Sequence, residues 1–335
     1  MYKLNIFYEE PNPDRWIKYD RYPRKFLRRI IRGPEPIGGV KRWFLNLIQG
    51  LDKLGYTYDI NNYNSIKKDS LQWALVIGKS HVIQQIPTDI KIIYGPGISS
   101  HPLDNDFWLK KPNIKHILIP CEWFKRMYDR DLPVNIPTTV WPSGVETDLW
   151  IPTPNKVFKN SILIYDKIRW NHEEYERELI RPIYSILNKV AINIHYIKYG
   201  SYKENHFKEL LKQVDGMIFL CEHETQGFAY LQTLSCDVPI LAWDRGGFWE
   251  DPSLYPQKVK FAPVTSVPYW NETCGEKFRT IDEFEPTFNI YWEKVLQQSY
   301  APRKYILANF KLEARAKSYI EIVEKIIKNH ARSQY

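Results

Sequence analysis

The chain has 335 residues, enough for two domains of ordinary size, and its balance of apolar and charged residues is that of a globular protein. Its formal net charge of +8 favours anionic ligands such as nucleotide diphosphates, phospholipid surfaces or nucleic acid. No apolar run reaches the ~20 residues that a membrane span needs, and the amino-terminal stretch lacks the apolar length of a signal peptide. We therefore expect a cytoplasmic protein.

Two further features bear on location. The segment from Arg21 to Arg32 mixes basic and apolar residues, as interfacial segments do, so it predicts either a peripheral membrane contact or a solvated loop. The cysteines show no metal-binding spacing, which predicts a reducing compartment and no metal site. They are Cys121, Cys221, Cys236 and Cys274.

The first half of the chain reads as alternating strands and helices. Two glycines, Gly38 and Gly39, precede a predicted helix at 40–54, which has one apolar face and ends at Gly55. A strand, a Gly-rich turn and a helix make a loop of the kind that binds nucleotides, although turn chemistry explains a Gly pair equally well. The predicted strands are 3–8, 56–60, 73–77, 90–94, 115–119 and one that begins at Thr138.

The second half repeats this alternation, which predicts a second doubly wound α/β sheet. A Pro-containing polar stretch at 152–159 is a reasonable linker. We therefore predict domains at 1–152 and 153–302, followed by a carboxyl-terminal helical segment at 303–335. The predicted strands are 161–165, 192–197, 217–221 and 240–242, and the predicted helices are 175–190, 203–214 and 228–236, with further helices within 281–300 and 302–328.

The stretch 215–244 is the most informative. A buried strand leads into a polar loop, and Gly227 opens the next helix. In parallel α/β sheets, such a loop binds ligands, and the helix amino terminus suits a phosphate. Glu224 lies at that edge and can accept hydrogen bonds from sugar hydroxyls. Lys167 and Arg169 follow the strand at 161–165, where they either neutralise a diphosphate or are exposed surface cations.

The segment from Glu224 to Gln232, Glu-Thr-Gln-Gly-Phe-Ala-Tyr-Leu-Gln, followed by Asp-Val-Pro-Ile-Leu-Ala from Asp237, resembles a known signature. It is similar to the Glu-x7-Glu motif of retaining GT-B glycosyltransferases, more narrowly the glycosyltransferases group 1 family (family 4). The resemblance implies two Rossmann-like domains that face a cleft, with a carboxyl-terminal helix that packs back on the first. Gln232 stands where that family has its second Glu, and Asp237 where it usually has Gly.

This resemblance also implies a donor-binding set. In that family the first Glu contacts the donor sugar and the second position holds the nucleotide ribose, which implies those roles for Glu224 and Gln232. The segment 142–150, Pro-Ser-Gly-Val-Glu-Thr-Asp-Leu-Trp, is similar to the family's hinge between domains. The implied donor-binding residues are Gly38, Gly39, Lys167, Arg169, Glu224, Gln226, Gly227, Phe228 and Gln232.

A histidine after a first-domain strand often contacts the donor sugar in this family. His101 is the candidate, and His81 competes with it. His223 adjoins Glu224 but would point the other way if the segment is extended. For each of these residues a surface or capping role is the alternative. Together with Glu224, Lys167 and Arg169, His101 completes the implied catalytic set.

The expected reaction is transfer of a hexose, with retention, from a UDP- or GDP-sugar to a glycan or lipid-linked acceptor. Its transition state resembles an oxocarbenium ion with a departing nucleotide diphosphate, whose charge the cations and a helix amino terminus stabilise. We expect no cofactor, no metal and no nucleic-acid partner. The main alternative, motivated by Gln232, is a catalytically weakened sugar-nucleotide-binding protein. A nucleotide-sugar epimerase of the same fold is a weaker alternative, because the acid/base carboxylates that it would use are not evident in this sequence. Nucleic-acid binding is a third alternative and rests only on charge and aromatic content.

Overall fold

The computed structural model describes residues 3–11, 17, 20, 23–24, 27, 37–68, 72–104, 111–154 and 157–332. Most of the basic segment from Arg21 to Arg32 lies outside these described residues. The chain divides into two compact units. The first comprises Met1–Pro120, Tyr128–Trp141 and Ala316–Tyr335, and the second comprises Cys121–Met127 and Pro142–Arg315.

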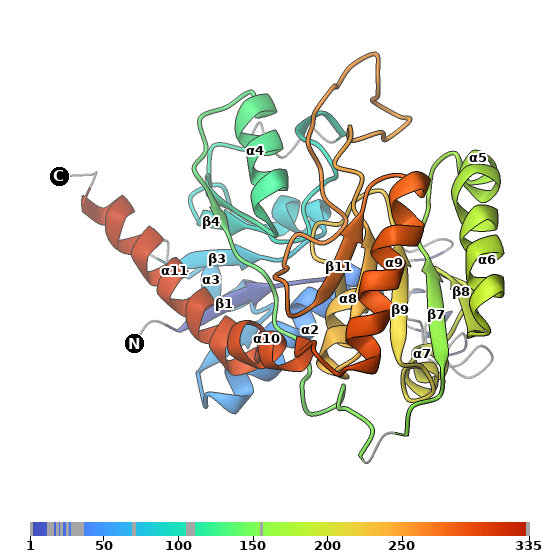
Figure 1. Cartoon of the computed structure of the whole chain (residues 1–335). Coiled ribbons are helices and arrows are strands. Elements are labelled where there is room, and N and C mark those ends of the chain that lie inside the picture. Colours follow the sequence, from blue (N-terminus) through green and yellow to red (C-terminus); the bar gives the residue numbers. More distant parts are fainter. Residues whose placement is uncertain are drawn as a thin grey trace. The chain divides into compact units, whose positions relative to one another are not determined.

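A six-stranded parallel sheet with the strand order β2-β1-β3-β4-β5-β6 forms the centre of the first unit; Figure 1 labels its strands β1, β3 and β4. Its strands are β1 (Leu4–Phe7), β2 (Tyr58–Ile60), β3 (Trp73–Val76), β4 (Lys91–Tyr94), β5 (Ile114–Ile119) and β6 (Thr138–Val140). Strands β1 and β3 are buried along their whole length, as is typical of parallel sheets covered on both faces. The helical segments are α2 (Gly39–Lys53), α3 (Tyr63–Ile66), η1 (Ser80–Gln85) and η2 (Pro102–Asp104), with α4 (Glu122–Asp131) and α11 (Leu312–Arg332) contributing residues to both units.

The second unit contains a five-stranded parallel sheet in the order β11-β10-β9-β7-β8. Its strands are β7 (Ser161–Asp166), β8 (Asn193–Lys198), β9 (Gly216–Leu220), β10 (Ile240–Trp243) and β11 (Gly275–Phe278). The helical segments are α5 (His172–Tyr175), the π-helical η4 (Glu176–Ile180), α6 (Arg181–Leu187), η5 (Asn188–Val190), α7 (Glu204–Leu211), α8 (Phe228–Ser235), α9 (Ile281–Leu296) and α10 (Pro302–Asn309). The strand order reverses at β7, which pairs with β8 on one side and with β9 on the other.

Alternate residues of the central strands build two separate cores in the second unit, because successive side chains of a strand point to opposite faces. Ile162 and Ile164 of β7 pack with residues from η4, α6 and α9. Leu163 and Tyr165 pack instead with residues from α7, α8 and α10. The sheet is therefore covered on both faces, and in Figure 1 α9 lies along one of them.

The predicted doubly wound α/β architecture is confirmed. The part of α11 from Ala316 on is grouped with the first unit, where the ring of Tyr319 lies 4.9 Å from that of Trp141 and the ring of His330 lies 5.3 Å from that of Trp73. The main element absent from the prediction is β11, whose sequence Gly-Glu-Lys-Phe carries two polar residues on a partly exposed edge strand. In the described part of the chain, no helix is both long and apolar enough to cross a membrane.

Candidate functional site

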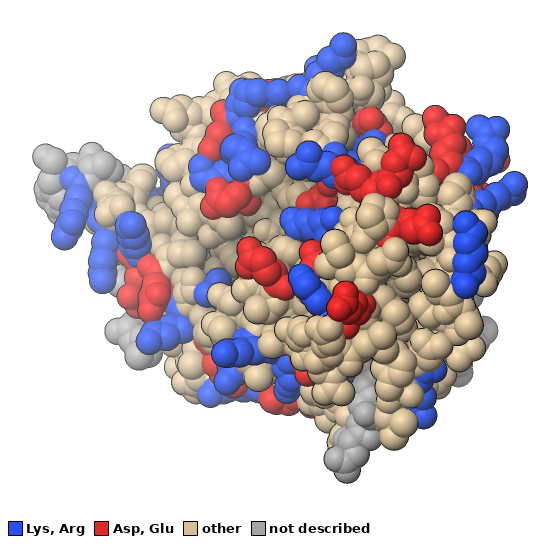
Figure 2. Space-filling model, in the orientation of Figure 1, with Lys and Arg blue, Asp and Glu red and all other residues tan. Residues whose placement is uncertain are grey.

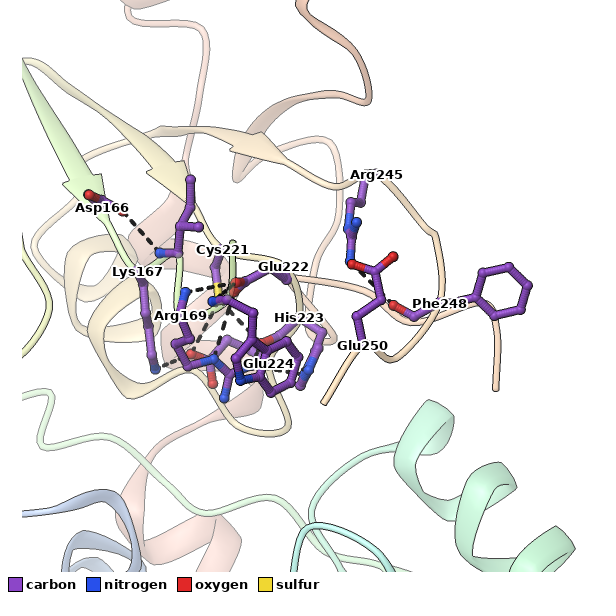
Figure 3. A network of polar contacts seen from close by, with 12 residues as sticks. Asp166, Lys167, Arg169, Cys221, Glu222, His223, Glu224, Arg245, Phe248 and Glu250 are labelled. Carbon is purple, nitrogen blue, oxygen red and sulfur yellow. Dashed lines mark hydrogen bonds and ion pairs between the residues drawn. The ribbon is translucent and has the colours of Figure 1, made fainter. Parts of the chain in front are cut away.

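The candidate site lies at the carboxyl edge of the five-stranded sheet. Asp166, the last residue of β7, is level with Leu220 of β9, which is level with Trp243 of β10. In open α/β sheets, ligands bind outside the carboxyl ends of the strands at the point where the strand order reverses. The side chains that follow these strands gather at this edge: Lys167, Arg169, Glu222, His223, Glu224 and Arg245 (Figure 3).

Lys167 and Glu224, which follow the neighbouring strands β7 and β9, form an ion pair (Figure 3). The backbone N–H of Lys167 donates to the carbonyl of Leu220 over 2.7 Å, which ties the two loops together. Its Nζ also lies 4.4 Å from the ring centre of Tyr199. Burial acts to lower the pKa of Lys167, but Glu224, Cys221 and Tyr199 together outweigh it and leave the pKa raised, so the side chain is an ammonium ion.

The main chain of Glu224 is held on both sides. Its N–H donates to the carbonyl of Thr265 over 2.9 Å, and its carbonyl accepts a 2.7 Å hydrogen bond from Nε1 of Trp123. The residue is 9% exposed, and its carboxylate meets Lys167 at the edge of the sheet. A carboxylate fixed in this way can accept hydrogen bonds from a ligand hydroxyl once its cation moves.

Arg169 and His223 form a second contact across the same two loops. Nη2 of Arg169 lies 3.1 Å from Nε2 of His223 and 3.2 Å from its carbonyl oxygen. The guanidinium also covers the ring of Trp170 at 4.7 Å. Burial, and then the cations Arg169, Arg245 and Lys167, hold the pKa of His223 well below its usual value, so its ring is neutral.

Helix α8 begins directly after the Glu224 loop. Gly227 has a φ of +70°, and a Cβ there would lie 2.0 Å from Cε1 of Tyr230, so only glycine fits. Gln226 is turned to the main chain of Ser143: its Oε1 accepts from the N–H over 3.0 Å and its Nε2 donates to the carbonyl over 3.4 Å. Phe228 is the first residue of α8. Gln232, one turn further on, is 5% exposed, and its Nε2 has no hydrogen-bond partner among the described residues.

No family model and no curated protein sequence matches this chain. Solved structures do match it. A sucrose-phosphate synthase from Thermosynechococcus elongatus superposes with a TM-score of 0.57 at 10% identity, over 87% of this chain and 94% of that one. The apo form of the lipopolysaccharide outer core galactosyltransferase WaaB gives 0.55 at 10% identity, over 97% and 99%. The pneumococcal O-GlcNAc transferase GtfA, in complex with UDP and GlcNAc, gives 0.52 at 8% identity, over 79% and 59%.

This chain has the GT-B fold. The site described above belongs to the second Rossmann-like unit of that fold, at the end of its first and third strands. Similarity at this level of identity establishes the architecture, so the roles of individual side chains rest on their geometry in this chain.

The first unit of the GT-B fold carries the remaining predicted residues. Gly38 and Gly39 stand at the start of α2, and a Cβ on either would meet no atom within 4 Å. Other glycines of this unit are required by close contacts. For example, a Cβ on Gly78 would lie 2.2 Å from Cγ1 of Val40, and one on Gly97 would lie 3.0 Å from the same atom. Both glycines come shortly after a strand, β3 or β4, and a glycine just after an apolar run is a pattern that can be seen in the sequence. A donor contact by Gly38 and Gly39 stays a prediction.

His101 is fully buried in the first unit and uses both ring nitrogens. Its Nδ1 accepts from the N–H of Leu103 over 3.1 Å, so the ring proton is on Nε2, which lies 2.8 Å from a carboxylate oxygen of Asp131. His81, in η1, is partly exposed. The prediction that one of them contacts the donor sugar stays open, and these bonds give His101 a structural role in any case.

Three residues at the edge of the sheet were absent from the predicted set. Glu222 hydrogen-bonds the loop that carries Arg169, and Trp123 holds the carbonyl of Glu224. Arg245 follows β10 just as Lys167 follows β7, so the same sequence signal was available for it. Its guanidinium donates to the hydroxyl of Tyr175 over 2.8 Å and to Glu250 over 2.9 Å, while the ring of Phe248 points away from the network (Figure 3). For Trp123 no local signal exists, because its partner is 101 residues away.

Proposed function

We propose that the protein is a glycosyltransferase that moves a hexose from a nucleotide-diphosphate sugar, UDP- or GDP-linked, to a glycan or lipid-linked acceptor with retention of configuration. The observation that supports this most is the pairing of Lys167 with Glu224 at the point where the strand order reverses. A cation for a diphosphate and a carboxylate for sugar hydroxyls are adjacent there, in a fold shared by the O-GlcNAc transferase GtfA, whose solved structure is a complex with UDP and GlcNAc.

In the proposed reaction, the bond from the anomeric carbon to the diphosphate oxygen breaks and a bond to the acceptor oxygen forms on the same face of the sugar. The departing phosphate takes the proton of the acceptor hydroxyl, so no protein base and no metal ion is assigned a step. Lys167 and Arg169 stabilise the negative charge that develops on the leaving group. Glu224 accepts hydrogen bonds from the sugar after Lys167 turns from it toward the phosphate oxygens.

The test is to incubate the protein with UDP-glucose, UDP-galactose, UDP-N-acetylglucosamine and GDP-mannose, with and without glycan acceptors, and to measure release of UDP or GDP. Lys167→Ala and Glu224→Ala should each lower turnover about 100-fold or more, as removal of a group that stabilises charge in the transition state does. The matched control is another ion pair of the same unit, Lys294 with Glu276 at 2.6 Å, whose removal should leave turnover unchanged. Wild-type rates in both site variants would refute the assignment.

A second candidate function is sugar-nucleotide binding without turnover, and Gln232 motivates it. Its unpaired Nε2 donor, in a residue that is almost fully buried, can bond a ribose oxygen. Gln232→Glu replaces this donor with an acceptor for a ribose hydroxyl. Saturable UDP binding without turnover in the wild type, together with turnover in Gln232→Glu, would favour the binding protein.

We also propose that the partners are a donor and an acceptor substrate, and not nucleic acid. Basic and acidic side chains are interspersed over the face that Figure 2 shows, whereas nucleic-acid-binding proteins concentrate basic residues in one patch or stripe. A cytoplasmic location and a peripheral membrane contact through the segment from Arg21 to Arg32 remain part of this proposal.

A further inference from the structure

Glu222 is a buried acidic residue at the candidate site with no role in the scheme above. It is the second residue after β9 and is 1% exposed. A single oxygen of its carboxylate, Oε1, accepts the backbone N–H of Arg169 over 2.7 Å and that of Trp170 over 2.8 Å. The side chain thus links the loop after β9 to the loop after β7, across the point where the strand order reverses.

With these two bonds, every backbone N–H group from residue 167 to residue 170 has an acceptor. Four successive backbone N–H groups after β7 point at fixed acceptors. The N–H of Lys167 bonds the carbonyl of Leu220, and that of Ile168 bonds Oδ1 of Asp166 over 3.0 Å. The next two belong to Arg169 and Trp170 and end on Glu222. Both bonds to Glu222 are partly buried, so loss of this carboxylate would remove the two contacts that fix the part of the loop that carries Arg169 and leave its main chain free to move.

The second oxygen of Glu222, Oε2, indicates that this side chain acts mainly through the hydrogen bonds to Oε1 and less through its negative charge. Oε2 forms no hydrogen bond to any described residue, and its nearest cation atom is Nε of Arg169 at 3.7 Å. The carboxylate therefore acts chiefly through one oxygen on two main-chain groups. Its negative charge, close to Arg169, works against the binding of an anionic ligand.

We infer that Glu222 is a positioning residue: by holding the main chain of the loop after β7, it keeps Arg169 in the position in which Arg169 binds the donor diphosphate. This inference rests on the proposed function, since it presumes that Arg169 binds a diphosphate. It predicts different outcomes for two substitutions. Glu222→Gln keeps an oxygen at Oε1 and places an amide nitrogen where Oε2 has no hydrogen bond, so it preserves the loop and removes the charge. Glu222→Ala removes both acceptors.

The experiment measures UDP and GDP affinity by titration calorimetry. Glu222→Ala should weaken binding about tenfold or more, whereas Glu222→Gln should bind as tightly as the wild type or more tightly. In the Arg169→Ala background, Glu222→Ala should cause no further loss, because Glu222 acts through Arg169. Equal weakening by Gln and Ala, or no weakening by Ala, would overturn the inference. If Glu222→Ala does not fold, Glu222→Asp, which draws the carboxylate back by one methylene, takes its place.

A matched control separates positioning from general destabilisation. Asp215 is also buried, and its Oδ2 accepts the backbone N–H groups of Lys159 over 2.9 Å and Ser161 over 3.1 Å, but at the amino edge of the same sheet. Asp215→Ala should lower the melting temperature and leave UDP affinity unchanged. Amide hydrogen exchange at Arg169 and Trp170 should be slow in the wild type and Glu222→Gln, and fast in Glu222→Ala. If the wild type binds neither nucleotide, the proposed function fails, while unchanged exchange in Glu222→Ala would refute the role of Glu222.

Discussion

Replacement of Gly227 by alanine tests the entry into helix α8. The alanine would have to adopt a φ of +70°, which costs an L-residue about 1–2 kcal/mol. Its Cβ would also lie 2.0 Å and 2.4 Å from two ring carbons of Tyr230. That ring is fully buried, and its hydroxyl accepts the N–H of Tyr269 over 3.1 Å, so it cannot move aside cheaply. Overpacking of this kind adds about 1–3 kcal/mol. The expected total destabilisation is about 2–5 kcal/mol.

For a domain of this size, such a loss lowers the melting temperature by roughly 4–20 °C. Scanning calorimetry of Gly227→Ala measures it, and UDP affinity should fall as well because the amino end of α8 shifts. Gly200→Ala is the matched control: its φ is +83°, but a Cβ there meets nothing within 4 Å, so it has only the backbone cost of about 1–2 kcal/mol. Equal melting temperatures for the two variants would refute the clash with Tyr230.

Three further outcomes follow from the site and its surroundings. Because the pKa of His223 is lowered, the unfolded chain takes up a proton below pH ~6.5 that the folded chain does not, so stability should fall with decreasing pH by up to about 1.4 kcal/mol per pH unit. Melting curves of wild type and His223→Gln between pH 5 and 7.5 check this, and equal slopes would contradict it. Gln232→Glu should lower the melting temperature without ligand, through burial of a new carboxylate, and raise UDP affinity; weaker UDP binding would exclude a ribose contact of the expected kind. His101→Ala should lower the melting temperature, since the N–H of Leu103 loses the acceptor Nδ1 and, among the described residues, Asp131 keeps only its bonds to Arg130; unchanged melting with abolished turnover would place His101 at the donor instead.

The parts of the site that the sequence predicts are those that follow from strand ends. Lys167 and Glu224 each come shortly after a short apolar run, and parallel strands bring such residues to one edge. Which strands are neighbours is a tertiary property, however, and only the pairing of β7 with β9 makes these two residues an ion pair.

Other parts depend on packing that no local pattern encodes. The conspicuous pair Gly38 and Gly39 has open space around it, while Gly78 and Gly97 accommodate Val40. That difference is set by where α2 lies against its own sheet, and turn composition does not reveal it. Glu222 reads in sequence as one more polar loop residue, although in the folded chain its carboxylate is buried and holds two main-chain groups.

The way the chain is shared between the two units has a consequence for engineering. The second unit is not one uninterrupted stretch, because Cys121–Met127 is grouped with Pro142–Arg315, while the last residues are grouped with the first unit. A chimera that transplants the second unit of this chain onto another protein of the GT-B fold, at a single junction near residue 142, would carry Ser143, the partner of Gln226, but leave Trp123 behind. The carbonyl of Glu224 would then lose its hydrogen bond. A transplant of this unit should therefore include both segments together.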